Sequence, residues 1–346
     1  MIVGRVRLCS KVRMMKPYLH LVILALFLCL SVGASDKPQQ GGKTLIEEAE
    51  DKANIFALPS FEIKANIRLE NIGKMLEGSY SFLWNGPEDW REEINLPGYS
   101  EIQVGGKGVV FLKRTTEFLP LRIDQLHSTL GYGTGGSIRS TFVNMEPAPN
   151  ETVKKVQDRN EKGRKLSCVE MESVVEGLKS PREVCVDASK GTLVRRVQFL
   201  DGDPMPVGTK MFPRFLSYVE DGKPLVEVQI IELNTSEPAP LSTFEPPQGA
   251  TSRSGCMNPI PPYLLRQPQP KYPLQERAAR TEGKVSISTL IGSDGMPRQL
   301  KIVSGATPGL NSASADGVQQ WRYSPATCSG HPEDFETIIN IVFKMS

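Results

Sequence analysis

The sequence predicts an α+β protein with two domains. A curved antiparallel β-sheet with one or two helices is expected over residues 45–250, and a small helix–strand–strand–helix–strand domain over residues 269–346. Three observations predict this. Hydrophobic and polar residues alternate along most of the first region, as in half-buried strands. Prolines crowd residues 234–270 and leave a proline-rich linker at 251–268. The last segment mixes helical and strand periodicity.

The N-terminal 34 residues have the features of a secretory signal peptide. Basic residues without any acid occupy residues 1–18, and an almost unbroken hydrophobic run follows from Leu19 to Val32. This run is shorter than the roughly 20 residues that cross a bilayer. Small residues stand before Ser35, as at a cleavage site. We predict cleavage after Ala34 and a periplasmic protein. An uncleaved inner-membrane anchor is the alternative.

The charge balance excludes a polyanion-binding protein. The chain has 41 basic and 39 acidic residues, and loss of the signal removes basic residues only. Nucleic-acid binding depends on a surplus of lysine and arginine, which is absent from this sequence. We therefore expect no nucleic-acid partner.

Four cysteines remain after removal of the signal: Cys168, Cys185, Cys256 and Cys328. An even number in an exported chain favours disulfides. Their spacing includes no close cysteine or histidine pair, so it does not suit a zinc site. Three pairings are possible. Cys168 and Cys185 lie on two strand-like runs joined by a turn. We predict a bridge between them, which leaves Cys256 to pair with Cys328.

The elements of the first domain follow from its periodicity. Apolar residues alternate with polar ones from Phe61 to Leu69, which predicts a strand with one buried face. Further strand-like runs are Ser79–Trp84, Val109–Leu112, Leu193–Phe199, Phe212–Val219 and Leu225–Leu233. Hairpin turns are expected at Asn85-Gly86, Asp201-Gly202 and Asp221-Gly222. Helical spacing is found in Thr44–Phe56 and Leu119–Leu130.

A curved sheet with a helix in its concavity resembles the LolA/LolB lipoprotein-carrier architecture. The run from Gly78 to Glu93 is similar in style to the strands of that group. The resemblance implies a concave face that holds an acyl chain or a lipoprotein. A periplasmic lipid or lipoprotein carrier is therefore an alternative function of residues 45–250.

Nothing in the sequence predicts catalytic residues, a cofactor or a metal site. Only His127 and His331 remain after signal removal, and both are expected to be surface residues rather than members of a catalytic triad. Glu92 and Glu93 are neighbours on a predicted strand, so they face opposite sides and cannot act as an acid–base pair. Solvated positions are expected for both. We predict that the protein is not an enzyme.

Two glycine-rich segments resemble phosphate-binding loops only superficially. Gly105–Gly108 lacks the Gly-Lys-Ser/Thr ending of a nucleotide loop, and Gly131–Gly136 lacks a following helix. Turns and a loop are the simpler interpretation of both.

The second domain is predicted from alternating element types. In order, we expect a helix at Pro273–Arg280, strands at Lys284–Ile291 and Gln299–Val303, a helix capped by Asn311, and a last strand at Glu336–Phe343. Pro273 suits the first turn of the first helix because its φ is already helical. Trp321 follows the second helix at helical spacing and is expected to pack on the sheet.

An ordered set of short motifs runs through the same segment. The motifs are Gln269-Pro270-Lys271-Tyr272-Pro273, Glu282-Gly283-Lys284-Val285, Asp294-Gly295, Trp321-Arg322-Tyr323-Ser324-Pro325 and Asn340-Ile341-Val342-Phe343. This string resembles the TonB C-terminal domain, the periplasmic module that couples inner-membrane energy to outer-membrane transport. The resemblance implies that the last strand is an exposed edge. Such an edge captures an extended peptide of a cell-envelope protein, for example an outer-membrane transporter.

The resemblance also assigns roles to residues. The implied partner-binding residues are Gln269, Tyr272, Thr337, Ile338, Ile339, Asn340, Ile341, Val342 and Phe343. The implied fold-determining residues are Gly283, Trp321, Tyr323 and Pro325. Self-association through the same edge is an open alternative, because unpaired strands also pair with copies of themselves. A membrane-anchored energy transducer is a further alternative, although the proline-rich spacer is short for that role.

Overall fold

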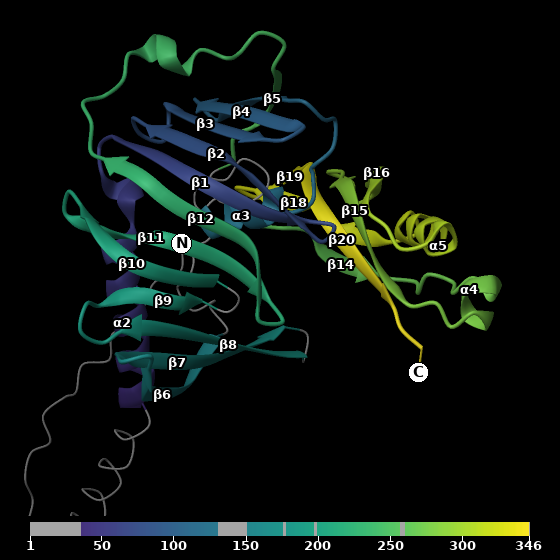
Figure 1. Cartoon of the computed structure of the whole chain (residues 1–346), viewed down its shortest axis with the longest axis horizontal. Coiled ribbons are helices and arrows are strands. Elements are labelled where there is room, and N and C mark those ends of the chain that lie inside the picture. The colour runs from purple at the N-terminus through teal and green to yellow at the C-terminus, as the bar shows by residue number, and fades with distance from the viewer. Residues whose placement is uncertain (1–35, 131–150, 176–177, 197–198, 257–259, 346) are drawn as a thin grey trace, which may run out of the picture.

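A computed structural model describes residues 36–130, 151–175, 178–196, 199–256 and 260–345. The predicted signal segment and the run Gly131–Gly136 lie outside the described residues. The predicted fold class is confirmed. A large curved antiparallel sheet with few helices is followed by a small α+β domain (Figure 1). Within the described residues, no helix combines the length and hydropathy needed to span a membrane.

The described part of the first domain contains a 13-stranded antiparallel sheet. Its helices are α2 (Asp36–Ala53), η1 (Ile55–Ala57), α3 (Ile123–Leu130) and η2 (Leu241–Phe244). Its strands are β1 (Phe61–Asn71), β2 (Lys74–Trp84), β3 (Trp90–Leu96), β4 (Tyr99–Gly106), β5 (Val109–Arg114), β6 (Glu151–Glu161), β7 (Arg164–Val175), β8 (Leu178–Asp187), β9 (Thr192–Arg196), β10 (Phe199–Val207), β11 (Lys210–Glu220), β12 (Lys223–Asn234) and β13 (Thr251–Ser254).

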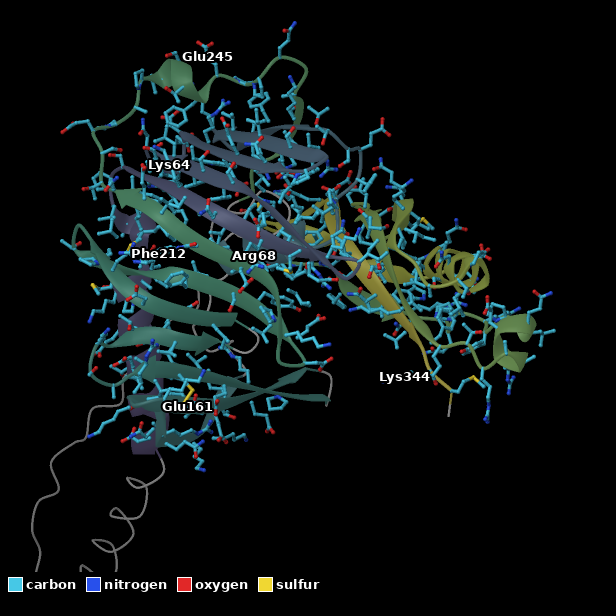
Figure 2. All side chains as sticks on the ribbon, viewed as in Figure 1. Lys64, Arg68, Glu161, Phe212, Glu245 and Lys344 are labelled. Carbon is cyan, nitrogen blue, oxygen red and sulfur yellow. A yellow bond between two sulfur atoms is a disulfide. The ribbon has the colours of Figure 1, made fainter. Side chains whose placement is uncertain are left out.

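The sheet is two meanders joined along one seam. The spatial order is β13-β5-β4-β3-β2-β1-β12-β11-β10-β9-β8-β7-β6, so β1 pairs with β12 in the middle. Along β1 the alternation is as predicted, because Phe61, Ile67 and the apolar residues between them are at most 2% exposed. Lys64 points away from the core (Figure 2). Its ammonium lies 2.9 Å from the Glu232 carboxylate, and both side chains are partly exposed. A register shift after Lys64 helps the sheet to curve.

The two helices fill the concave side of this sheet. α2 lies against strands β6, β8, β9 and β11, and α3 lies against β11 and β12 (Figure 1). Ile46 of α2 and Leu126 of α3 have no exposed surface and belong to one core cluster. The first helix begins earlier than predicted, at Asp36. The second begins later than predicted, at Ile123. The reason is that Leu119 precedes Pro120, and the residue before proline disfavours helical backbone angles.

Two of the three predicted hairpin turns are present. Asn85-Gly86 joins β2 to β3, and Asp221-Gly222 joins β11 to β12 with positive φ at both residues. The predicted turn at Asp201-Gly202 is wrong, because these residues lie within β10 and pair with β11. Asp201 is only 5% exposed there. Long-range pairing outweighs the local turn preference, and the chain turns at Gly208 instead.

The proline-rich region runs along the protein surface rather than away from it. The Asn85 side chain donates to the Ala239 carbonyl at 2.8 Å and accepts from its amide at 3.0 Å. Further along, β13 adds to β5 and so lengthens the large sheet. The strand β14 (Tyr263–Arg266) pairs with the second domain. Residues 251–268 therefore contribute one strand to each domain.

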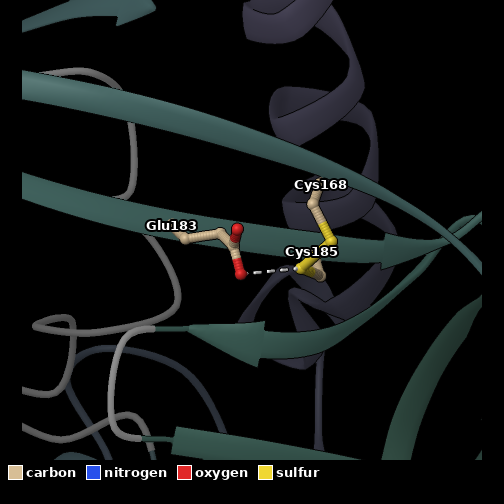
Figure 3. A group of neighbouring side chains, drawn as sticks. All are labelled: Cys168, Glu183 and Cys185. Atoms are coloured by element: carbon tan, nitrogen blue, oxygen red, sulfur yellow. Dashed lines mark hydrogen bonds between the residues drawn. A yellow bond between two sulfur atoms is a disulfide. The ribbon is translucent and has the colours of Figure 1, made fainter. Parts of the chain in front are cut away.

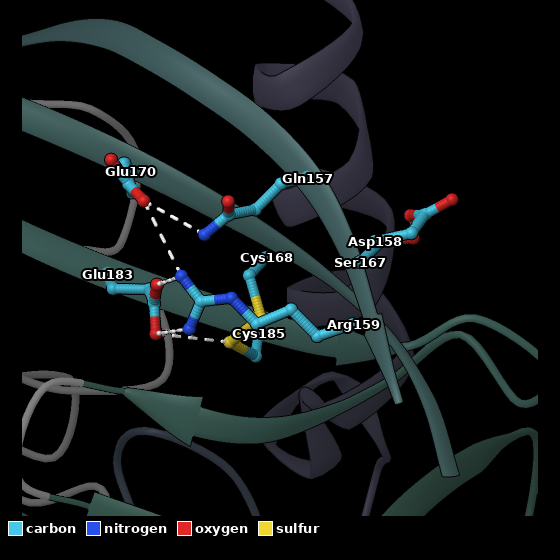
Figure 4. The surroundings of a disulfide bond; sticks show 8 residues. All are labelled: Gln157, Asp158, Arg159, Ser167, Cys168, Glu170, Glu183 and Cys185. Atoms are coloured by element: carbon cyan, nitrogen blue, oxygen red, sulfur yellow. Dashed lines mark hydrogen bonds and ion pairs between the residues drawn. A yellow bond between two sulfur atoms is a disulfide. The ribbon is translucent and has the colours of Figure 1, made fainter. Parts of the chain in front are cut away.

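Cys168 and Cys185 stand directly opposite each other on β7 and β8 and form the predicted disulfide (Figure 3). Charged side chains surround it. Arg159 lies between Glu183 and Glu170, at 2.6 and 3.4 Å from their carboxylates (Figure 4). The bridge ties two neighbouring strands in a part of the sheet that is remote from the second domain (Figure 1).

The second domain is built around a three-stranded sheet, ordered β16-β15-β20. Its elements are α4 (Leu274–Ala278), β15 (Gly283–Ile291), β16 (Pro297–Ser304), α5 (Pro308–Val318), β17 (Arg322–Ser324), β18 (Ala326–Cys328), β19 (His331–Glu333) and β20 (Phe335–Phe343). The hairpin of β18 and β19 is an addition to the predicted elements. The second predicted disulfide, Cys256–Cys328, joins this hairpin to the linker.

The helix α5 begins differently from the prediction. Its N-cap is Thr307, whose hydroxyl accepts from the Leu310 amide at 3.3 Å, and Pro308 occupies the first turn. The predicted cap, Asn311, is instead inside the helix and accepts from the Ala306 amide at 2.9 Å. The helix therefore starts one turn earlier and packs Leu310 into the core of the second domain.

Candidate functional site at the edge of the C-terminal sheet

The strand β20 lies at one edge of the three-stranded sheet. It pairs with β15 along its whole length, from Gly283 opposite Phe343 to Ile291 opposite Phe335. No strand in the described part of the chain pairs with its other side. An edge strand presents a row of backbone donors and acceptors that another extended segment can use.

One face of β20 belongs to the core of the second domain. Ile339, Ile341 and Phe343 are 8%, 7% and 5% exposed and pack in one cluster with residues of α5 and β15. Their side chains are therefore committed to the fold. Any contribution they make to partner binding must come from their backbone groups.

The other face of the sheet lies against the first domain. Ile338 packs against the core cluster of the large sheet. The Leu119 amide donates to the Ser288 hydroxyl of β15 at 3.1 Å. The Arg114 guanidinium binds the Glu336 carboxylate at the start of β20. The first half of β20 is thus held by the first domain through the side chains of Glu336 and Ile338.

The ion pair between Arg114 and Glu336 is the main charged contact between the domains. The Arg114 Nη1 atom donates to Glu336 at 2.9 Å, and the two side chains are 10% and 16% exposed. Arg114 also donates to the carbonyls of Thr116 and Glu117. Burial would lower the pKa of Arg114, but the hydrogen bond and charge of Glu336 outweigh it and raise this pKa.

The second half of β20 is more exposed. Asn340 is exposed, and its side-chain oxygen accepts from the Ser286 hydroxyl at 2.7 Å. Val342 is 56% exposed. Thr337 is half-buried. Figure 1 shows this half of the strand running away from the first domain toward the C-terminus. The accessible part of the predicted binding strand is therefore its last five residues.

The approach segment before α4 lies at the end of β20. The ring of Tyr272 meets the ring of Phe343 edge to face, with centroids 5.2 Å apart. Its hydroxyl donates to the Thr281 carbonyl. Tyr272 is therefore half-buried and supports the strand, whereas Gln269 is exposed. Of these two predicted contact residues, only Gln269 has a side chain that is exposed at the surface.

The four residues predicted to determine the fold all lie in or beside the core of the second domain. A Cβ atom on Gly283 would come within 2.6 Å of the Ala306 Cβ. Trp321 is 4% exposed, and burial raises the pKa of the neighbouring Tyr323 to about 12. Pro325 is half-buried between β17 and β18. The close approach of Ala306 explains the glycine at position 283, and burial in the core explains the tryptophan at position 321.

Sequence reasoning missed a buried polar group in the first domain. His127 and Glu92 were expected at the surface, but they are 6% and 4% exposed, so both expectations are wrong. They lie beside Glu101, which is 2% exposed. The alternation along β3 could have predicted the burial of Glu92, because Trp90 and Ile94 share its face of the strand and are buried. His127 is buried because it lies on the face of α3 that is turned toward the core.

The concave face that a lipid carrier would use is occupied by protein. Ile46 and Ile55 from the N-terminal helices and Leu126 from α3 are at most 1% exposed on that side. These side chains pack against the sheet in one continuous cluster. Binding an acyl chain there would require a helix to move away from the sheet.

Comparison with known proteins identifies the second domain. Residues 268–345 match the family Gram-negative bacterial TonB protein C-terminal. The predicted resemblance is confirmed for this segment. A curated relative, Protein TonB of Salmonella typhimurium, is 26% identical over 125 residues, which is 33% of this chain. The chain spans half the length of that relative.

Two solved structures are similar to parts of this chain. The TonB CTD of Pseudomonas aeruginosa is 23% identical, with a TM-score of 0.22 over 24% of this chain and 86% of that one. A LolA superfamily protein from Nitrosomonas europaea is 12% identical, with a TM-score of 0.37 over 59% of this chain and 97% of that one.

Proposed function

We propose that this is a non-enzymatic periplasmic protein of the cell envelope, and that its C-terminal domain captures an extended segment of an envelope protein. The captured segment adds to the outer edge of β20 by main-chain hydrogen bonds. The match of residues 268–345 to the TonB C-terminal family supports the compartment and the class of partner. An outer-membrane transporter is the partner that this family resemblance favours.

The observation that carries the proposal is the state of β20. One of its faces is packed in the domain core and its first half is held by the first domain, yet no described strand pairs with its outer edge. The last five residues, from Ile339 to Phe343, offer about 17 Å of edge. Only Asn340 and Val342 present exposed side chains there. Recognition would therefore depend mostly on the backbone, with these two side chains adding selectivity.

The sharpest test blocks the edge from within the same molecule. A C-terminal extension that starts with an Asn-Gly turn after Lys344 and continues with alternating threonine and valine residues should fold back along β20. The matched control is the same extension with two prolines, which cannot join a ladder. A photo-crosslinking amino acid at Asn340 then reports capture in intact cells.

We expect a crosslinked envelope protein with the unextended chain and with the proline control. The pairing extension should abolish that crosslink. A crosslinker at Ser312, which is exposed on α5, should not give the same product. Equal crosslinking with and without the pairing extension would show that the edge is not the binding site. A product with the mass of two copies of this chain would identify self-association as the use of this edge.

The anchored energy transducer differs from this proposal at the N-terminus. Edman sequencing of the protein isolated from periplasmic extract should begin at Ser35 if the signal is removed after Ala34. A chain that retains its first residues and fractionates with the inner membrane would favour the transducer instead.

A further inference from the structure

A histidine and two glutamates from three different elements meet in the interior of the first domain. His127 lies on α3, Glu92 on β3 and Glu101 on β4. They are 6%, 4% and 2% exposed. The His127 Nε2 atom is 3.3 Å from a Glu92 oxygen and 3.5 Å from a Glu101 oxygen. One ligand atom from each residue lies within 4.8 Å of the other two.

The carboxylates of Glu92 and Glu101 carry more negative charge than the basic side chain in direct contact with them, His127, can offset. Two buried carboxylates side by side are costly unless a cation lies between them. Among the described residues, His127 is the one basic side chain within 4.0 Å of either carboxylate. Arg253 instead donates to the Gln103 side chain at 2.6 Å, and Arg114 is paired with Glu336 outside the group.

The geometry fits a shared metal ion better than a shared proton. A protonated imidazole donates a charge-assisted hydrogen bond to one carboxylate at about 2.7–2.9 Å. Here Nε2 is almost equally far from both carboxylates and makes no hydrogen bond, and Glu92 Oε1 also has none. Ligand atoms around a tetrahedral ion with bonds of about 2.1 Å are roughly 3.4 Å apart. The two measured separations lie on either side of that value.

Neighbouring groups hold Glu101 in position. The Tyr99 hydroxyl donates to one of its carboxylate oxygens, and the Gln103 amide donates to the other at 2.7 Å. Gln103 is in turn held by Arg253. Hydrogen-bonded carboxylates of this kind are usual around protein metal sites, where the outer groups fix the orientation of the ligands.

We propose that Glu92, Glu101 and His127 bind a divalent transition-metal cation, with Zn²⁺ as the best match to one imidazole and two carboxylates. The ion would tie α3 to the concave face of the sheet at β3 and β4. Its role would be structural, and it is independent of partner capture by β20. The sequence gives no spacing signal for such a site, because its ligands come from distant positions.

Cobalt absorption tests the proposal directly. The protein is purified without a histidine tag, freed of metal with a chelator, and titrated with Co²⁺, whose visible bands report nitrogen and oxygen ligands in tetrahedral geometry. We expect saturation at one equivalent and displacement by Zn²⁺. His127→Gln and Glu92→Gln should each weaken binding at least tenfold. His331→Gln is the matched control, because His331 is exposed and should leave the titration unchanged.

Several results would overturn the proposal. Wild-type protein that shows no saturable Co²⁺ spectrum contains no such site, and this measurement needs no variant to fold. Binding that survives in His127→Gln, or that disappears in His331→Gln, places the metal elsewhere. If the glutamine variants do not fold, Tyr99→Phe keeps all three ligands and should weaken binding about tenfold by releasing Glu101. An unchanged affinity in Tyr99→Phe would then contradict the proposed geometry.

Discussion

Replacing Glu336 with glutamine should loosen the contact between the two domains. The amide has the shape of the carboxylate but carries no charge, so Arg114 loses its counter-ion. Arg114 is buried at this contact, with a side chain 10% exposed. It keeps its bonds to the carbonyls of Thr116 and Glu117, so its donors do not all become unpaired. The perturbation therefore removes the charge of Glu336, which is bound by Arg114 and also lies 3.9 Å from Arg253.

The magnitude follows from the burial of the pair. Removing one partner of a fully buried ion pair costs about 3–5 kcal/mol, and an exposed pair contributes about 0–1 kcal/mol. The Glu336 and Arg114 side chains are 16% and 10% exposed, and Arg114 retains two acceptors. We therefore expect a loss of about 2 kcal/mol, which corresponds to roughly a 30-fold change in the docking equilibrium.

Amide hydrogen exchange measures this equilibrium at one atom. The Leu119 amide donates across the interface to the Ser288 hydroxyl, so it exchanges when the domains separate. Glu336→Gln should speed its exchange about 30-fold. The matched control is Lys284→Gln, because Lys284 is 3.7 Å from Glu220 across the same interface but is 42% exposed. That exposed pair should contribute little, and the control should change exchange less than about 2-fold.

The reasoning fails if both variants change Leu119 exchange equally. It also fails if Glu336→Gln leaves that exchange unchanged, because the buried pair would then contribute nothing to docking. Arg114→Met combined with Glu336→Gln completes a double-mutant cycle. The double variant should be less destabilised than the sum of the single variants, because neither buried charge is then left unpaired.

The remaining predictions concern stability. Gly283→Ala should lower stability by about 2 kcal/mol, measured by urea unfolding, because the new methyl group meets Ala306 at 2.6 Å. Replacing Cys256 and Cys328 with serine should cost about 4 kcal/mol, because their bridge closes a separation of 72 residues. Burial by itself would raise the pKa of Glu70, but the hydrogen bond from the Gly73 amide and the charge of Arg122 outweigh burial and lower this pKa. The Glu70 carboxylate therefore stabilises the fold above pH ~4, and this stabilisation is lost as the pH falls through the lowered pKa. Glu70→Gln should flatten that part of the pH profile of stability.

Each of these predictions has a control in the same chain. Gly41→Ala, at a helical position with open space around it, should leave stability unchanged or raise it by up to about 1 kcal/mol. Loss of the Cys168–Cys185 bridge, with a separation of 17, should cost less than loss of the longer one. Glu77→Gln should keep the wild-type acid profile, because Glu77 is 76% exposed. Equal effects in test and control would contradict the corresponding prediction.

Local sequence patterns predicted the elements whose environment repeats regularly. The alternation from Phe61 to Leu69 predicted a strand with one buried face, and β1 has that pattern. The strand-like runs around Cys168 and Cys185 predicted the cross-strand bridge. The last strand was predicted within one residue of its observed start at Phe335. In each case the residue pattern and the final environment have the same period.

Local patterns misled where distant segments decide the environment. Asp201-Gly202 has turn chemistry but lies inside β10, because pairing with β11 satisfies its backbone. His127 gives no sign of burial by itself, and its surroundings are made by β3 and β4. Likewise Arg114 and Glu336 are 222 residues apart, so nothing in the sequence connects them. Contacts of this kind form only when the chain has folded.

By itself, then, the sequence determined the fold class, the disulfide partners and the TonB-like character of the last segment. These properties depend on spacing along the chain, which is already present before folding. Only the tertiary structure decided that the first half of β20 is held by the first domain and that its outer edge has no described strand partner. It also decided that a buried histidine meets two glutamates. Such features depend on which surfaces meet, and packing between distant residues determines that.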